Sequence, residues 1–187
     1  MTDDTLLDIE ASFLYRKTER DDAEVGTSVA TTRARILAID PGTEESGWCV
    51  LADGRVTLSG VMKNREVLRM LESTAGYDPL NHTLAIEMIA SYGMAVGREV
   101  FETCRWIGRF QQAWHKPEAV RFVYRKDVKL HLCGSPRAKD ANIRQALIDL
   151  LGPQGTKKNP GPTYGVKSHA WAALAVAVTA ADNINKA

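Results

Sequence analysis

The chain has 187 residues, of which 44% are hydrophobic and 25% charged, ordinary values for a globular domain that builds its own core. They exclude a wholly disordered, a collagen-like and a disulfide-dense protein. The sequence holds no apolar run of about 18 residues, so we expect no membrane span. The acidic start, residues 1–4, lacks the basic and then apolar order of a signal peptide. Three widely spaced cysteines without a CxxC motif predict reduced thiols in a cytoplasmic protein.

The net charge of +1 is unevenly distributed along the chain. Residues 1–33 hold eight acidic and four basic residues, and we interpret them as a flexible acidic extension, either a mobile tail or a docking segment. Residues 6–14 within it have the pattern of one short amphipathic helix. The span 115–145, in contrast, has eight basic and three acidic residues. Such a stretch is typical of a surface that faces phosphates, and equally of a solvated surface.

Apolar runs and turn signals predict one mixed α/β domain over residues 34–187. An Asp-Gly pair at 53–54 predicts a tight hairpin. The order of elements predicts an antiparallel N-terminal three-strand meander, then parallel strands with α/β crossovers, flanked by helices. In chain order, we expect strands at 36–39, 47–51 and 56–61, a helix at 64–75, a strand at 83–86, a helix at 94–115, a strand at 120–124, and helices at 125–132, 137–151 and 166–184.

Two acidic residues, Asp40 and Glu87, directly follow apolar strand segments. The carboxyl ends of neighbouring parallel strands meet at one edge of a sheet, where α/β ligand sites form. If the two strands are adjacent, about 5 Å apart, the carboxylates can share a hard cation. The alternatives are structural: Asp40 as a turn residue before Pro-Gly, and Glu87 as the partner of an arginine such as Arg98 or Arg121.

A third polar position, His169, lies near the start of the last predicted helix. The small residues that follow it allow this helix to lie close against a sheet, and Gly47 permits a close backbone approach near Asp40. A histidine in this position is more often a surface or packing residue. It becomes a candidate metal or phosphate ligand if the helix end meets Asp40 and Glu87.

Together these motifs resemble the RuvC family of Holliday junction resolvases, and the bacteriophage-type branch most. The resemblance covers about residues 35–182 in the family's order. It implies an RNase H-like fold and an endonuclease that cuts four-way DNA junctions with two divalent ions, Mg²⁺ or alternatively Mn²⁺. It also implies a homodimer about a two-fold axis, with the helix at 94–115 in the interface, and, for a phage protein, the host cytoplasm. The segments that carry the resemblance are Ile36–Thr43 with Ser46–Gly47, Leu84–Glu87, and Ser168–Ala177.

The resemblance assigns roles to four positions. Asp40 matches the family's first catalytic Asp, Glu87 its second-strand Glu, and His169 the first ligand position of the last helix. The family's Asp three residues later falls on Ala172, which has no ligand atom. This departure implies a chain that binds junctions and cleaves them little or not at all. We interpret Ala172 as an engineered substitution of that Asp, which would inactivate the nuclease and keep its fold and binding. The alternative is a native alanine in a non-catalytic junction-binding protein.

The resemblance also gives the basic stretch a role in DNA binding. Lys129 and Lys139 are similar to family lysines near the scissile phosphate, where a lysine steadies the strand or the developing charge. Tyr92, after the second carboxylate, is a candidate for contact with a base at the branch point. For each of these residues a solvated surface position is the alternative. The candidate DNA-binding residues are Arg125, Lys126, Lys129, Arg137, Lys139 and Tyr92.

Two further functions stay open on the sequence. An ATPase of the actin and sugar-kinase type also has an Asp-x-Gly-Thr loop after a strand, but needs two such halves where this chain has one. A nuclease of the same fold could act on forks, flaps or RNA–DNA hybrids, because the carboxylate motif recognises metal and phosphate rather than branch geometry.

Overall fold

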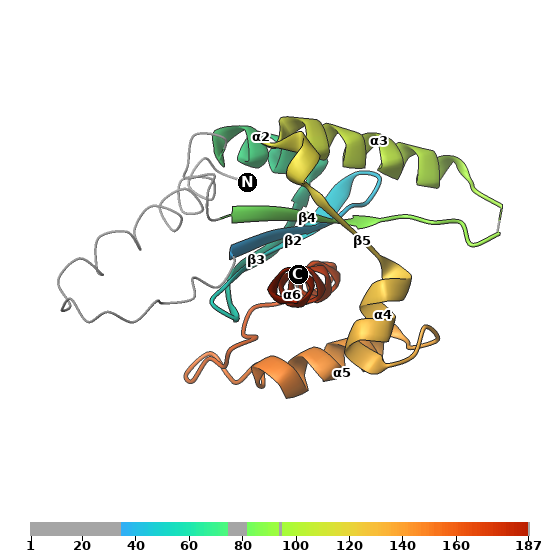
Figure 1. Cartoon of the computed structure of the whole chain (residues 1–187). Coiled ribbons are helices and arrows are strands. Elements are labelled where there is room, and N and C mark those ends of the chain that lie inside the picture. The colour runs from blue at the N-terminus through green and yellow to red at the C-terminus, as the bar shows by residue number, and fades with distance from the viewer. Residues whose placement is uncertain (1–34, 75–81, 94, 187) are drawn as a thin grey trace. The chain divides into compact units, whose positions relative to one another are not determined.

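The computed structural model describes residues 35–74, 82–93 and 95–186 (Figure 1). The acidic extension and its predicted short helix lie outside these ranges, so both stay predictions, as does the domain boundary near residue 34. The strands are β1 Arg35–Asp40, β2 Glu45–Ala52, β3 Arg55–Lys63, β4 His82–Met88 and β5 Arg121–Tyr124. The helices are α2 Asn64–Thr74, α3 Arg98–Ala113, the short 3₁₀ helix η2 Pro117–Ala119, α4 Arg125–Cys133, α5 Asp140–Leu151 and α6 Ala170–Asn185.

The five strands form one mixed sheet in the order β3-β2-β1-β4-β5. The first three strands pair antiparallel, whereas β4 pairs parallel with β1 and β5 parallel with β4. The turn between β2 and β3 has both Asp53 and Gly54 at positive φ, 53° and 74°, as the two central residues of a type I′ hairpin turn require. The predicted meander, crossovers and hairpin are therefore confirmed.

Helices cover both faces of the sheet. α2 and α3 lie on one side, and α6, with α4 and α5, on the other (Figure 1). The Ile36–Ile39 run of β1 is at most 1% exposed because both faces are covered, and this explains its continuous apolar sequence. The alanine-rich body of α6 packs on β1 and β2. Within the described ranges, no helix has the length and apolar character needed to cross a membrane.

Three helices begin later than the sequence pattern predicts, so these boundaries were wrong. α3 begins at Arg98 rather than 94, α5 at Asp140 rather than 137, and α6 at Ala170 rather than 166. Before α6, Gly165 and Ser168 have φ values of +85° and +46°, which an α-helix does not accommodate. Ser168 and His169 consequently form the approach to α6, with His169 as its N-cap residue.

Candidate functional site

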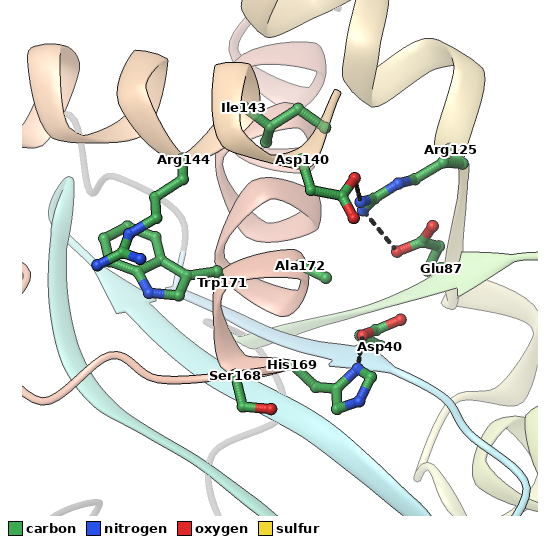
Figure 2. A pocket seen from close by; sticks show the side chains of 10 residues that line it. All are labelled: Asp40, Glu87, Arg125, Asp140, Ile143, Arg144, Ser168, His169, Trp171 and Ala172. Atoms are coloured by element: carbon green, nitrogen blue, oxygen red, sulfur yellow. Dashed lines mark hydrogen bonds and ion pairs between the residues drawn. The ribbon is translucent and has the colours of Figure 1, made fainter. Parts of the chain in front are cut away.

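Parallel pairing of β1 and β4 brings the two predicted carboxylates to one edge of the sheet. Ile39 is in register with Ile86, so Asp40 and Glu87 follow side by side. The N-terminal end of α6 meets the same edge. A pocket of about 450 Å³ opens there (Figure 2). Its lining residues are Asp40, Glu87, Arg125, Asp140, Ile143, Arg144, Ser168, His169, Trp171 and Ala172.

A buried hydrogen-bond network holds the turn that follows Asp40. The Ser46 hydroxyl donates to Asn64 Oδ1 at 2.6 Å, and Asn64 Nδ2 donates to the Gly42 carbonyl at 3.0 Å. A Cβ atom on Gly42 would lie 2.4 Å from the carbonyl oxygen of Glu45, so this turn requires glycine. Asn64 did not emerge from the sequence, because nothing local distinguishes it from any other polar residue at a helix start.

His169 reaches the site because α6 begins almost in contact with β2. A Cβ atom on Gly47 would lie 2.3 Å from the His169 carbonyl oxygen, which confirms the close approach predicted at this glycine. The His169 side chain is 63% exposed, and its Nδ1 lies 3.2 Å from Asp40 Oδ2. The predicted meeting of His169 with the carboxylate edge is thus present.

Burial makes the two carboxylates unusual acids. The side chains of Asp40 and Glu87 are only 18% and 13% exposed. Burial raises the pKa of Asp40, an effect that the neighbouring His169 and Arg125 partly offset. Burial and the adjacent charge of Asp40 together raise the pKa of Glu87 to about 8, again against an opposing effect of Arg125. Two crowded acids with raised pKa values form a place where a bound cation would relieve the repulsion.

An arginine forms an ion pair with Glu87, as the alternative to a cation site predicted, but the arginines named for that role, Arg98 and Arg121, were wrong. The partner is Arg125, the first residue of α4, whose Nη1 lies 3.5 Å from Glu87 Oε2. Its Nη2 contacts Asp140 Oδ1 at the start of α5. Arg98 instead pairs with Glu102 on α3. Asp140 is a pocket residue that the sequence did not reveal, because only tertiary packing brings the start of α5 beside β4.

Position 172 faces the pocket without contributing a polar atom. The Ala172 methyl group points toward the space beside Asp40 and Glu87 (Figure 2). Asp182, ten residues further along α6, binds His131 at 2.8 Å instead. In the described ranges, no three His, Cys, Asp or Glu side chains are already gathered around a common point for an ion. The buried pair Asp40 and Glu87, with His169 beside it, fits one hard divalent cation; α6 offers no side-chain donor for a second.

Of the six candidate DNA-binding residues, Arg125 lies among the described residues that line the pocket. The other five are not among the residues that line the pocket, and their contact with DNA stays a prediction. Tyr92 is 58% exposed in the loop after β4, with φ of +46°. Lys126 and Lys129 are on α4, and Arg137 and Lys139 lie between α4 and α5; Lys129 is half-buried and the other three are exposed.

No protein-family model matches the sequence, and comparison with curated proteins gives no match. Among solved structures, Thermus thermophilus RuvC is similar, with a TM-score of 0.59 and 21% identity over 81% of this chain and 96% of that one. T. thermophilus RuvC in complex with Holliday junction substrate is also similar, with a TM-score of 0.61 and 23% identity over 82% and 96%. At these identities the similarity establishes the fold: a RuvC-like, RNase H-like mixed sheet flanked by helices, as predicted.

Proposed function

We propose that this chain binds branched DNA, four-way junctions above all, at a nuclease-type site whose cleavage is strongly impaired by Ala172. The observation that carries the proposal is the buried Asp40–Glu87 pair at the carboxyl ends of two parallel strands, beside a helix start that has no carboxylate at position 172. The fold supports it, and one similar structure holds a Holliday junction substrate.

The site fits a divalent cation, Mg²⁺ or Mn²⁺, held by Asp40 and Glu87 with His169 beside them. Bound there, such an ion supplies Lewis-acid chemistry for phosphodiester hydrolysis. Asp40 is oriented by His169 Nδ1 on one side and by the rigid turn on the other. Ala172 has no atom that can ligate a metal ion, so hydrolysis that depends on two ions lacks one of its metal ligands. Phosphate binding by the basic side chains does not depend on that ligand and is retained. Strong binding with little cleavage follows.

The proposal includes a homodimer, which suits a junction with two strands to cut. The helix α3 carries Phe101, which is 59% exposed, and the half-buried Val100 and Cys104. A second copy of this chain would cover such apolar side chains. Tyr92, exposed just before this helix, is the proposed contact to an unpaired base.

The test compares the chain with Ala172→Asp on a labelled four-way junction, with Mg²⁺ and with EDTA. We expect both proteins to bind and only Ala172→Asp to cut, in Mg²⁺ alone. Ala119→Asp is the matched control, since it adds the same carboxylate at an exposed position outside the pocket lining, and should not cut.

Full cleavage by the unaltered chain would refute the role given to position 172. Binding by both with cutting by neither would indicate a native, non-catalytic junction-binding protein. Stronger binding or cutting of forks, flaps or RNA–DNA hybrids in the same assay would replace the four-way junction as the substrate.

A further inference from the structure

A fixed positive charge stands inside the pocket, on the wall formed by the starts of α4 and α5. The Arg125 guanidinium lies between two carboxylates: its Nη1 is 3.5 Å from Glu87 Oε2, and its Nη2 contacts Asp140 Oδ1 (Figure 2). The side chain is only 28% exposed. Because the two carboxylates belong to different elements, β4 and α5, the guanidinium is held from both sides, and its place is determined by the fold.

The chemistry of this group matches that of a bound cation. A guanidinium stays charged at every relevant pH and presents several N–H donors in one plane, which suits two acceptors and leaves donors for a phosphate. The same pocket lacks a carboxylate at position 172, where a second ion would need a ligand. One positive charge is therefore already fixed in this pocket, and position 172 offers a second ion no ligand.

We propose that Arg125 takes the place of a second divalent cation in this pocket, so that each chain binds one ion. The guanidinium offsets part of the negative charge of Glu87 and Asp140 and donates hydrogen bonds to a DNA phosphate, while the single ion is held by Asp40 and Glu87, with His169 beside them. This inference rests on the proposed function, because the single ion is the one assigned there. It also gives a physical basis for the phosphate binding that the proposed function assigns to a site without two ions.

A second arginine in the same pocket provides the matched control. The Arg144 guanidinium lies 4.9 Å from the centre of the Trp171 ring and donates to Gln154, a neutral side chain. Arg144→Gln removes the same charge from the same pocket as Arg125→Gln, without releasing Glu87 or Asp140. A difference between the two variants then reports the carboxylate bridge and not the overall charge of the pocket.

The experiment counts Mn²⁺ ions bound per chain, by electron paramagnetic resonance of free Mn²⁺, with the full-length protein and no DNA. We expect one ion for the unaltered chain, for Arg144→Gln and for the charge-conserving Arg125→Lys. We expect two for Arg125→Gln, because Asp140 and the Glu87 oxygen that Arg125 contacts become free to hold the second. Arg125→Gln/Asp140→Asn should return the count to one, since a freed donor is removed.

Two ions on the unaltered chain would overturn the inference, and that count needs no variant. One ion on folded Arg125→Gln, with the unaltered chain also at one, would overturn it as well. In both cases the ion site of the proposed function would stand. No bound ion on any of these proteins would instead overturn the metal site itself, and the inference with it. Circular dichroism of each variant confirms that the count is made on folded protein.

Discussion

A histidine–aspartate pair lies at each end of α6, and each pair joins α6 to another element. The contrast between the two pairs shows what distinguishes a functional site from a structural contact. At the start of α6, exposed His169 binds Asp40, a buried acid that lies beside a second buried acid. Near its end, Asp182 is half-exposed and binds the more buried His131 of α4. The second pair ties two helices together. The first has an acid crowded by like charge, so it is the one suited to a cation. Burial of the acid, not the pair itself, separates them.

The largest effect is expected from removing the acid of the first pair, Asp40, which His169 contacts. Asp40→Asn should weaken Mn²⁺ binding by about a hundredfold, because it removes the proposed shared ligand. Asp182→Asn, the same change at the other pair, should leave Mn²⁺ binding within about twofold. Calorimetric titration of both variants measures the difference. Equal losses in the two would show that the pairs do not differ in this respect.

The next effect tests why His169 lies where it does. Gly47→Ala should lower the free energy of unfolding by about 3 kcal/mol, because its Cβ would meet the backbone of His169. Gly108→Ala is the control: nothing lies near its Cβ position in α3, so it should be neutral or stabilising by up to about 1 kcal/mol. Urea denaturation measures both. A harmless Gly47→Ala would contradict the close approach of α6 to β2.

The crowding of the two acids should give the stability a pH dependence. The pKa of Glu87 is raised to about 8 in the folded state, so the folded protein holds a proton that the unfolded chain has released. Its contribution to stability is present at low pH and is lost as the pH rises through about 8. Without metal, the unaltered chain should lose roughly 2 kcal/mol more than Glu87→Gln between pH 6 and pH 9.

Urea unfolding in EDTA at several pH values measures these slopes. Glu99→Gln, at an exposed position on α3, is the control and should follow the unaltered chain. Parallel slopes for the unaltered chain and Glu87→Gln would show that Glu87 is not crowded.

The smallest effect compares the two histidines. His131→Ala should lower the free energy of unfolding by about 1 kcal/mol, since it removes a half-buried link between α4 and α6. His169→Ala should cost less than about 0.5 kcal/mol, because that side chain is mostly exposed, but it should weaken Mn²⁺ binding. Thermal unfolding of both variants tests the order. The reverse order would make His169 the structural residue.

Much of the fold follows from local patterns. The buried run before Asp40, the Asp53–Gly54 hairpin and the apolar segment before Glu87 each have a signal within a few residues, and each was predicted. The later starts of α3, α5 and α6 were not, because helical periodicity continues past the point where the backbone changes. Before α6, the positive φ of Ser168 keeps the helix from starting earlier, and the identity of this residue as serine does not predict that backbone conformation.

The sequence by itself determined which strands carry the acids, Asp40 and Glu87, because a strand and the residue after it are neighbours in the chain. It also placed an alanine at position 172, the departure on which the proposed function depends. Only the tertiary structure decided that Arg125 and Asp140 belong to the pocket and that Asn64 holds its turn. These residues are far from the acids in the chain, and their contacts depend on how α2, α4 and α5 pack around the sheet, a long-range outcome that no local pattern encodes.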